Sequence, residues 1–202
     1  MSVGSGVEHA EGGGTPRGQR THGFQIWLKM PRAKMGDAPR YGTVVPSAIP
    51  TVPLSPGSLA RVIAGPLGAV EGPARFGVEA QILDVVLAAG ATFDYARPAA
   101  LDTVMFYGFA GDATVDGAAL RAQEIAVLDA ASGDGAAVVA GPAGFRMMVF
   151  AGRRTNEDVC WHGPFVCADK RQLMDVFRAQ QAGKFPPVRV PYDYKDASKA
   201  PK

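Results

Sequence analysis

The sequence TVMFYGFAGDATVDG, residues 103–117, decides the fold class of this 202-residue chain. It begins with Thr103–Phe109, a run of β-branched and aromatic residues that predicts a strand. It ends at Asp116-Gly117, a pair that suits a two-residue hairpin because glycine tolerates positive φ. Similar runs occur at Leu59–Ile63, Gln81–Leu87, Glu124–Leu128, Ala136–Ala140 and Arg146–Phe150. Short strands separated by Gly, Pro and Asp turns predict an all-β sandwich or barrel.

The region before these runs is of a different kind. Phe24–Leu28 predicts one strand, with Phe24, Ile26 and Leu28 on the same face. Six prolines then fall between residues 31 and 58. Because proline removes a backbone donor and fixes φ, this segment cannot sustain a helix or a central strand. We interpret it as an extended linker between two packed units.

A single helix is predicted near the C-terminus. Asp169 is a candidate N-cap, and Gln172 follows it at the spacing of a capping box. Leu173, Val176 and Phe177 then form an apolar stripe at helical spacing. Gly183 is a suitable residue to end the helix, so we expect a short helix that packs through this stripe.

Composition excludes several classes of protein. The net charge of +2 argues against direct nucleic-acid binding. No apolar run is long enough to span a membrane, and the first 24 residues lack the apolar core of a secretory signal. Cys160 and Cys167 are too few for a disulfide framework or a zinc site, so we interpret them as small apolar residues. An intracellular location, cytoplasmic or nuclear, is expected.

His9 and Glu11 are the most suggestive pair for chemistry. At positions i and i+2 of a strand, both side chains leave the same face. A neutral imidazole and a carboxylate with open coordination positions suit iron(II). The alternative is that both are solvated polar residues in a loop. For His22 and His162, the other histidines of the chain, we expect structural roles.

Several segments, taken in chain order, resemble the pirin family, a branch of the cupins. The matching segments are GSGVEHAE (4–11), HGFQIWL (22–28), Lys34-Met35, PRY (39–41), LDV (83–85), GATF (90–93), WHGPFV (161–166) and GKF (183–185). The resemblance implies two stacked cupin barrels, with one iron held in the N-terminal barrel by a His-x-His and a His-x-Glu pair. It also implies that some relatives are quercetin 2,3-dioxygenases, which open a flavonol with molecular oxygen, and that animal members modulate transcription-factor complexes.

Four regions follow from the resemblance. Residues 1–50 are expected to be a remnant of the N-terminal cupin domain with the linker, and residues 51–167 an antiparallel cupin barrel. Residues 168–186 are expected to hold the helix, and residues 187–202 a flexible tail. His9 and Glu11 match the His-x-Glu pair, while the His-x-His pair is expected upstream of Met1. We therefore expect a truncated chain with half of an iron site.

Two functional hypotheses remain open. In the first, the intact protein binds Fe²⁺ and acts as a quercetin 2,3-dioxygenase-type enzyme or a redox-responsive transcriptional co-regulator, and this chain alone is inactive. A flavonol would then bind only with the full first barrel. In the second, the chain is a metal-free cupin scaffold that acts as an interaction or structural subunit. A protein partner would cover the apolar surface around Trp27 and Leu28.

Overall fold

The computed structural model describes residues 1–9, 18–20, 22–128 and 133–187. The chain divides into two compact units. One unit is Val44–Arg154, and the other combines Met1–Thr43 with Thr155–Lys202. Among the described residues, no helix is long and apolar enough to cross a membrane.

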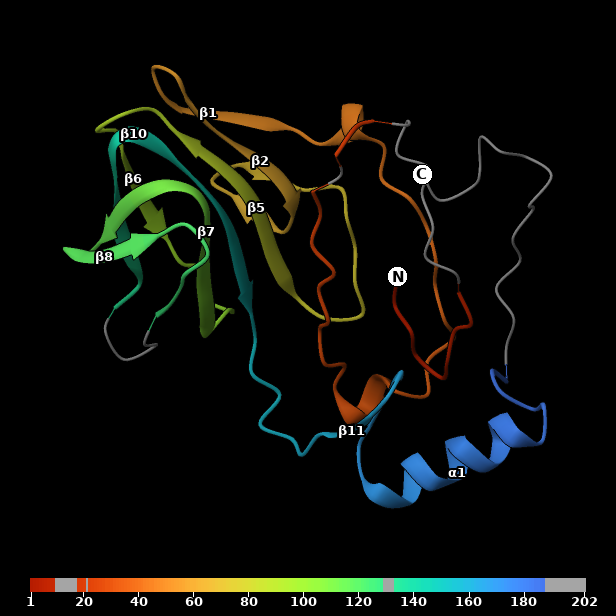
Figure 1. Cartoon of the computed structure of the whole chain (residues 1–202). Helices are drawn as coiled ribbons and strands as arrows, with labels where there is room; N and C mark the ends of the chain where they lie inside the picture. The colour runs from red at the N-terminus through yellow and green to blue at the C-terminus, as the bar shows by residue number, and fades with distance from the viewer. Residues whose placement is uncertain (10–17, 21, 129–132, 188–202) are drawn as a thin grey trace. The chain divides into compact units, whose positions relative to one another are not determined.

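The unit Val44–Arg154 is an antiparallel β structure (Figure 1). Its elements, in chain order, are η2 (Pro46–Ala48), β1 (Thr51–Ser55), β2 (Ser58–Ala64), β3 (Pro66–Leu67), β4 (Val70–Glu71), β5 (Ala80–Leu87), β6 (Thr92–Ala96), β7 (Thr103–Val115), β8 (Ala118–Arg121), β9 (Ile125–Leu128) and β10 (Gly135–Gly152). The main sheet follows the order β1-β2-β5-β10-β7-β8, with β6 joined to β10 and β9 joined to β7.

Two long strands, β7 and β10, belong to both halves of this barrel. The C-terminal part of β10, Phe145–Gly152, pairs with β5, whereas its N-terminal part, Gly135–Val139, pairs with β6. The strand β7 pairs with β9 near its start and with β8 near its end. One half is therefore β1-β2-β5-β10-β7-β9, and the other is β6-β10-β7-β8. The all-β barrel predicted from the sequence is confirmed.

The corner between the two halves depends on glycine. The β7–β10 register shifts between Ala140 and Phe145, and two glycines with positive φ, Gly111 (74°) and Gly144 (76°), lie close together there. A Cβ atom at Gly111 would lie 2.1 Å from the Gly144 carbonyl oxygen. Only glycine allows this approach in this backbone conformation, and the irregularity lets both strands bend from one half into the other.

The core fills the space between the two halves. Along β7, Val104 and Phe106 are buried while their neighbours in sequence are less buried, as the period of a strand requires. The Phe106 ring meets the Tyr95 ring of β6 edge to face, with centroids 5.3 Å apart. The core is contributed by both halves, for example by Val62, Leu83, Val115, Leu120, Val138 and Met147.

The second unit contains η1 (Arg32–Lys34), the hairpin of β11 (Cys160–His162) and β12 (Phe165–Cys167), and α1 (Lys170–Gln181). The helix prediction is confirmed. The Asp169 carboxylate accepts a hydrogen bond of 2.8 Å from the Gln172 backbone N–H. The Gln172 side chain in turn accepts one of 2.7 Å from the Ala168 N–H, and Gly183 takes a positive φ of 66° after the helix.

Several predicted boundaries need correction. Phe24–Leu28 is not a strand in the structure. The proline-rich linker ends in β1, which tolerates Pro53 because, among the described residues, β1 is an edge strand paired with β2 alone. Two predicted strands merge into β10. The hairpin β11–β12 groups with residues 1–43, and the expected domain bounds, 51–167 for the barrel among them, stay a prediction. Most of the expected tail lies outside the described residues.

The glycine corner can be tested by substitution. Replacing Gly111 with Ala should lower the free energy of unfolding by about 2–4 kcal/mol, because left-handed strain alone costs about 1–3 kcal/mol and the carbonyl contact adds to it. Gly152→Ala is the matched control in β10, where an added Cβ meets no atom within 4 Å. Urea unfolding of both variants measures the difference, and equal stability would contradict the role of this corner.

Candidate functional site

The predicted metal pair is only partly described. His9 is exposed, and Glu11 lies outside the described residues, so their relative geometry stays a prediction. Within the described ranges, no group of three or more His, Cys, Asp or Glu side chains is placed to hold a metal ion. The described residues therefore do not by themselves form a complete iron site.

The chain that leads to His9 is held by backbone contacts. Ser2 and Arg40 exchange hydrogen bonds of 2.8 and 2.9 Å between N–H and carbonyl groups, and the Ser5 N–H donates to the Asp37 carbonyl at 2.9 Å. A Cβ at Gly6 would lie 2.6 Å from the ring of Phe185. Close packing against Phe185, in the segment after α1, thus explains why residue 6 is glycine.

A partly buried ion pair joins the two segments of this unit. The Lys29 Nζ lies 2.8 Å from the Glu157 Oε2, and the Arg32 backbone N–H donates to the same oxygen at 2.8 Å. The hydrogen bond from Lys29, followed by that from Arg32, lowers the pKa of Glu157. Glu157 consequently remains ionised and ties residues 29–32 to the segment that precedes β11.

The other histidines have aromatic neighbours. His162 packs edge to face against Phe177 of α1, with ring centroids 5.5 Å apart. His22 lies 5.0 Å from the Phe24 ring, and both are exposed. On the same unit, the Trp27 and Trp161 rings are 5.5 Å apart. All three histidines and both cysteines belong to this unit, since residues 44–154 contain neither type.

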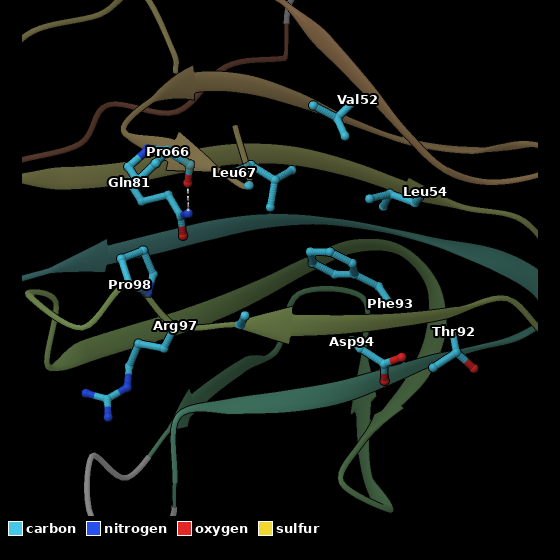
Figure 2. Close-up of a pocket in the computed structure, with 12 residues that line it drawn as sticks. Val52, Leu54, Pro66, Leu67, Gln81, Thr92, Phe93, Asp94, Arg97 and Pro98 are labelled. Carbon is cyan, nitrogen blue, oxygen red and sulfur yellow. Dashed lines mark hydrogen bonds between the residues drawn. The ribbon is translucent and has the colours of Figure 1, made fainter. Parts of the chain in front are cut away.

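The barrel has a pocket of about 630 Å³ between the edge strand β1 of one half and β6 of the other. Figure 2 shows Leu54, Leu67 and Phe93 around the same space. The lining consists of Val52, Leu54, Pro66, Leu67, Gly68, Gln81, Thr92, Phe93, Asp94, Ala96, Arg97 and Pro98. A volume of this size falls in the usual range of small-molecule sites, about 300–1,000 Å³.

A neutral polar network includes Gln81 of this lining. Gln81 is 1% exposed, its Oε1 accepts a hydrogen bond of 2.7 Å from the Tyr95 hydroxyl, and its Nε2 donates to the Pro66 carbonyl (Figure 2). Burial raises the pKa of Tyr95 to about 12, against a smaller opposing effect of Arg97. The hydroxyl therefore stays protonated and donates to Gln81.

The charged groups of the lining are directed elsewhere. Arg97 donates to the carbonyls of Leu101 and Gly133, both at 3.2 Å, and pairs with Asp134 at 3.1 Å. Asp94 is exposed on the outer side of β6. Among the described residues that line the pocket, none offers an imidazole or a thiolate. The pocket does not fit a transition-metal centre, which requires such donors or clustered carboxylates.

Comparison with known proteins agrees with this architecture. Residues 82–186 match the family model of the pirin C-terminal cupin domain. This chain belongs to the pirin family. A pirin-like protein of Caulobacter vibrioides is 32% identical over 188 residues, which cover 92% of this chain and 66% of that protein.

Two further relatives are relevant. A Thermoplasma acidophilum protein provisionally named as a quercetin 2,3-dioxygenase is 26% identical over 210 residues, covering 95% of this pirin-family chain and 79% of that protein. The crystal structure of quercetin 2,3-dioxygenase from Acinetobacter baumannii superimposes with a TM-score of 0.73 at 23% identity, covering 79% of this chain and 55% of that one. The latter similarity shows the shared cupin fold.

The pocket and the buried hydrogen bond between Gln81 and Tyr95 are not predicted in the sequence analysis. Gln81 sits at the start of the apolar run QILDVVL, and Tyr95 alternates with Phe93 on β6. An amide at an inward position of a strand was a usable signal, because buried polar groups need partners. The partner itself comes from the facing half of the barrel, which local patterning does not specify.

The Tyr95–Gln81 contact predicts an alkaline limit of stability. An unfolded tyrosine ionises near its ordinary pKa of 10.0, whereas Tyr95 in the folded chain retains its proton up to about 12. The free energy of unfolding should therefore fall as pH rises from 10 to 12. In Tyr95→Phe this contribution should be absent, and stability at neutral pH should drop by about 1–3 kcal/mol because Gln81 loses its donor. Denaturant unfolding at pH 8, 10 and 11 tests both, and identical pH profiles would contradict the assignment.

Proposed function

We propose that this pirin-family chain contributes His9 and Glu11 as two ligands of iron(II) in an oxygenase of the quercetin 2,3-dioxygenase type. The observation that carries the proposal is the similarity along 95% of the chain to a relative of that name. An imidazole and a carboxylate belong to the donor set that retains iron(II) with open positions. The flavonol substrate is the expectation that follows from this similarity.

The residues present limit what can be assigned. Two donors fall short of the three or four that hold a catalytic metal firmly, and the described ranges offer no third. We therefore assign no catalytic step to His9 or Glu11. The bound iron would supply the activation of oxygen, and further donors are required to complete its coordination.

The barrel Val44–Arg154 serves in this proposal as a metal-free scaffold. It contains no histidine or cysteine, and the amide of Gln81, which lines its pocket, is hydrogen-bonded to the neutral Tyr95. A folded cupin does not by itself imply catalysis. In this proposal the barrel has a structural role only, and the iron is bound by the unit that contains the histidines.

Metal analysis tests the ligand assignment. After desalting, the 202-residue chain should retain well under one iron per molecule, because losing even outer partners of a metal costs about 10–100-fold in affinity and losing direct ligands costs more. Titration with Fe²⁺ under anaerobic conditions should show weak binding that His9→Ala lowers by at least about tenfold. His22→Ala is the matched control. One tightly held iron per chain, or equal binding by both variants, would contradict the proposal.

Oxygen uptake tests the activity. Flavonol-dependent oxygen consumption should be absent in the 202-residue chain. It should appear in a chain lengthened by an in-frame upstream sequence that encodes His-x-His, and His9→Ala should abolish it there. An in-frame stop codon directly upstream of Met1, together with protein of this length in cells, would favour the alternative below.

The alternative function is a metal-free interaction subunit. Its support is an exposed aromatic pair, Trp27 (53% exposed) and Trp161 (68% exposed), with Phe24, Ile26 and Val159 also exposed on the same unit. Leu28, expected to be exposed beside Trp27, is half-buried. Exposed aromatic surface of this kind is typical of an interaction site, and a protein partner is the proposed occupant.

Dye binding and oligomeric state test this alternative. The chain should bind a hydrophobic dye or self-associate in light scattering, and the double variant Trp27→Ser with Trp161→Ser should reduce either signal at least severalfold. Val127→Ser is the control, since Val127 is 63% exposed but lies on β9 of the barrel unit. A monomer that binds no dye would exclude an interaction surface at the aromatic pair.

A further inference from the structure

The two cysteines of the chain, seven positions apart, lie directly opposite each other. They occupy the paired ends of the β11–β12 hairpin, where Cys160 faces Cys167, Trp161 faces Val166 and His162 faces Phe165. Both are free thiols. Their spacing in the sequence does not specify a strand register, so the sequence alone indicates two small apolar residues. The structure supplies that register and makes them a pair.

Both thiols lie on the same side of the hairpin. Residues directly opposite in an antiparallel pair project to one face. Cys167 is buried at 4% exposure within an apolar cluster with Phe165 and Leu173, and Cys160 packs against this cluster from a half-buried position. Burial raises the pKa of Cys167, and its proximity to the Cys160 sulfur raises it further. The two sulfur atoms are therefore neighbours.

The geometry of a strand pair is compatible with a disulfide. Opposed Cα atoms in an antiparallel ladder are about 4.5–5.5 Å apart, and disulfides span about 4.4–6.8 Å between Cα atoms. Opposed Cβ atoms are about 4.5–5.5 Å apart in a ladder, whereas a disulfide prefers about 3.5–4.5 Å. The hairpin must tighten slightly at this pair, and strained disulfides are the readily reduced ones.

We propose that Cys160 and Cys167 form a reversible intramolecular disulfide when the chain meets a low-molecular-weight disulfide such as oxidised glutathione. Cys160, the more accessible thiol, loses its proton, attacks one sulfur of the oxidant and expels the first thiolate. Cys167 then loses its proton and attacks the Cys160 sulfur of the mixed disulfide, which expels the second thiolate. Two protein thiols become one disulfide, the oxidant gains two electrons, and the two protons convert its thiolates into thiols.

The location of the pair links this bond to the rest of the unit. Cys167 is followed by Ala168 and the N-cap Asp169, so β12 continues directly into α1. The cluster that contains Cys167 also includes Leu173 of α1, with Val176, Phe177 and Phe185 packed against it. Closing the disulfide draws Cys160 toward this cluster and fixes the hairpin against fraying. Oxidation should thus stabilise the hairpin beside the exposed Trp161.

Thiol counting tests the proposal on the 202-residue chain. The protein is equilibrated with mixtures of reduced and oxidised glutathione. Free thiols are then alkylated with N-ethylmaleimide, and the mass of the intact chain is measured by mass spectrometry. Two alkylated thiols are expected under reducing conditions. Under oxidising conditions no alkylated thiol, no glutathione adduct and a loss of two hydrogen masses are expected, with a monomer on a non-reducing gel. Peptide mapping should recover residue 160 linked to residue 167.

A single substitution separates the internal bond from general thiol reactivity. Cys160→Ser, at the half-buried position, should keep Cys167 as a free thiol with at most slow glutathione addition, and the hairpin amides should lose the oxidation-dependent protection from hydrogen exchange seen in the unaltered chain. If the unaltered chain retains two free thiols in oxidised glutathione, accumulates glutathione adducts, or forms disulfide-linked dimers, the proposal is overturned.

Discussion

The close approach of Gly111 and Gly144 is the constraint on which the barrel depends. Two strands, β7 and β10, serve both halves. The strands β5, β6, β8 and β9 pair with one of these two, and β2 and β1 follow outward from β5. A continuous flat strand could not close around a core. The glycine corner lets each strand change direction without losing its partner, and the core residues of the two halves then meet across the interior.

The same closure supports the proposal that the barrel is a scaffold. Strand β5 belongs to one half and β6 to the other, so the Tyr95–Gln81 hydrogen bond bridges the interior. A buried amide and hydroxyl that satisfy each other leave little for an ion to bind. The neutral pair, the apolar walls and a stretch 44–154 without histidine or cysteine therefore support the proposal that any bound metal is held by the other unit.

Local patterning was sufficient to predict the elements whose sequence carries its own signal. Alternating burial in β7, the Asp116-Gly117 turn and the Asp169 cap all follow from short-range chemistry, and the structure has them. The strand predicted at Phe24–Leu28 is not formed, because alternation within one segment does not specify the neighbours that a sheet requires. The prolines of the linker segment led to β1 not being predicted, because an edge strand tolerates proline whereas a central strand does not. For the candidate site, the spacing of His9 and Glu11 predicts a ligand pair that stays a prediction, whereas the pocket is assembled from β1, β3, β5 and β6 and is not predicted by local patterning.

The division between the units also bears on the cysteines. The sequence places every imidazole and thiol of the chain in the unit that joins residues 1–43 with 155–202. Within it, Glu157 fixes the segment before β11 through Lys29 and Arg32, and the Asp169 cap fixes the segment after β12. The hairpin between these anchors brings Cys160 and Cys167 together by register alone. Because both ends are held, a bond between the two sulfur atoms would change the hairpin locally, next to the packing of Phe165 against Leu173 and Phe177.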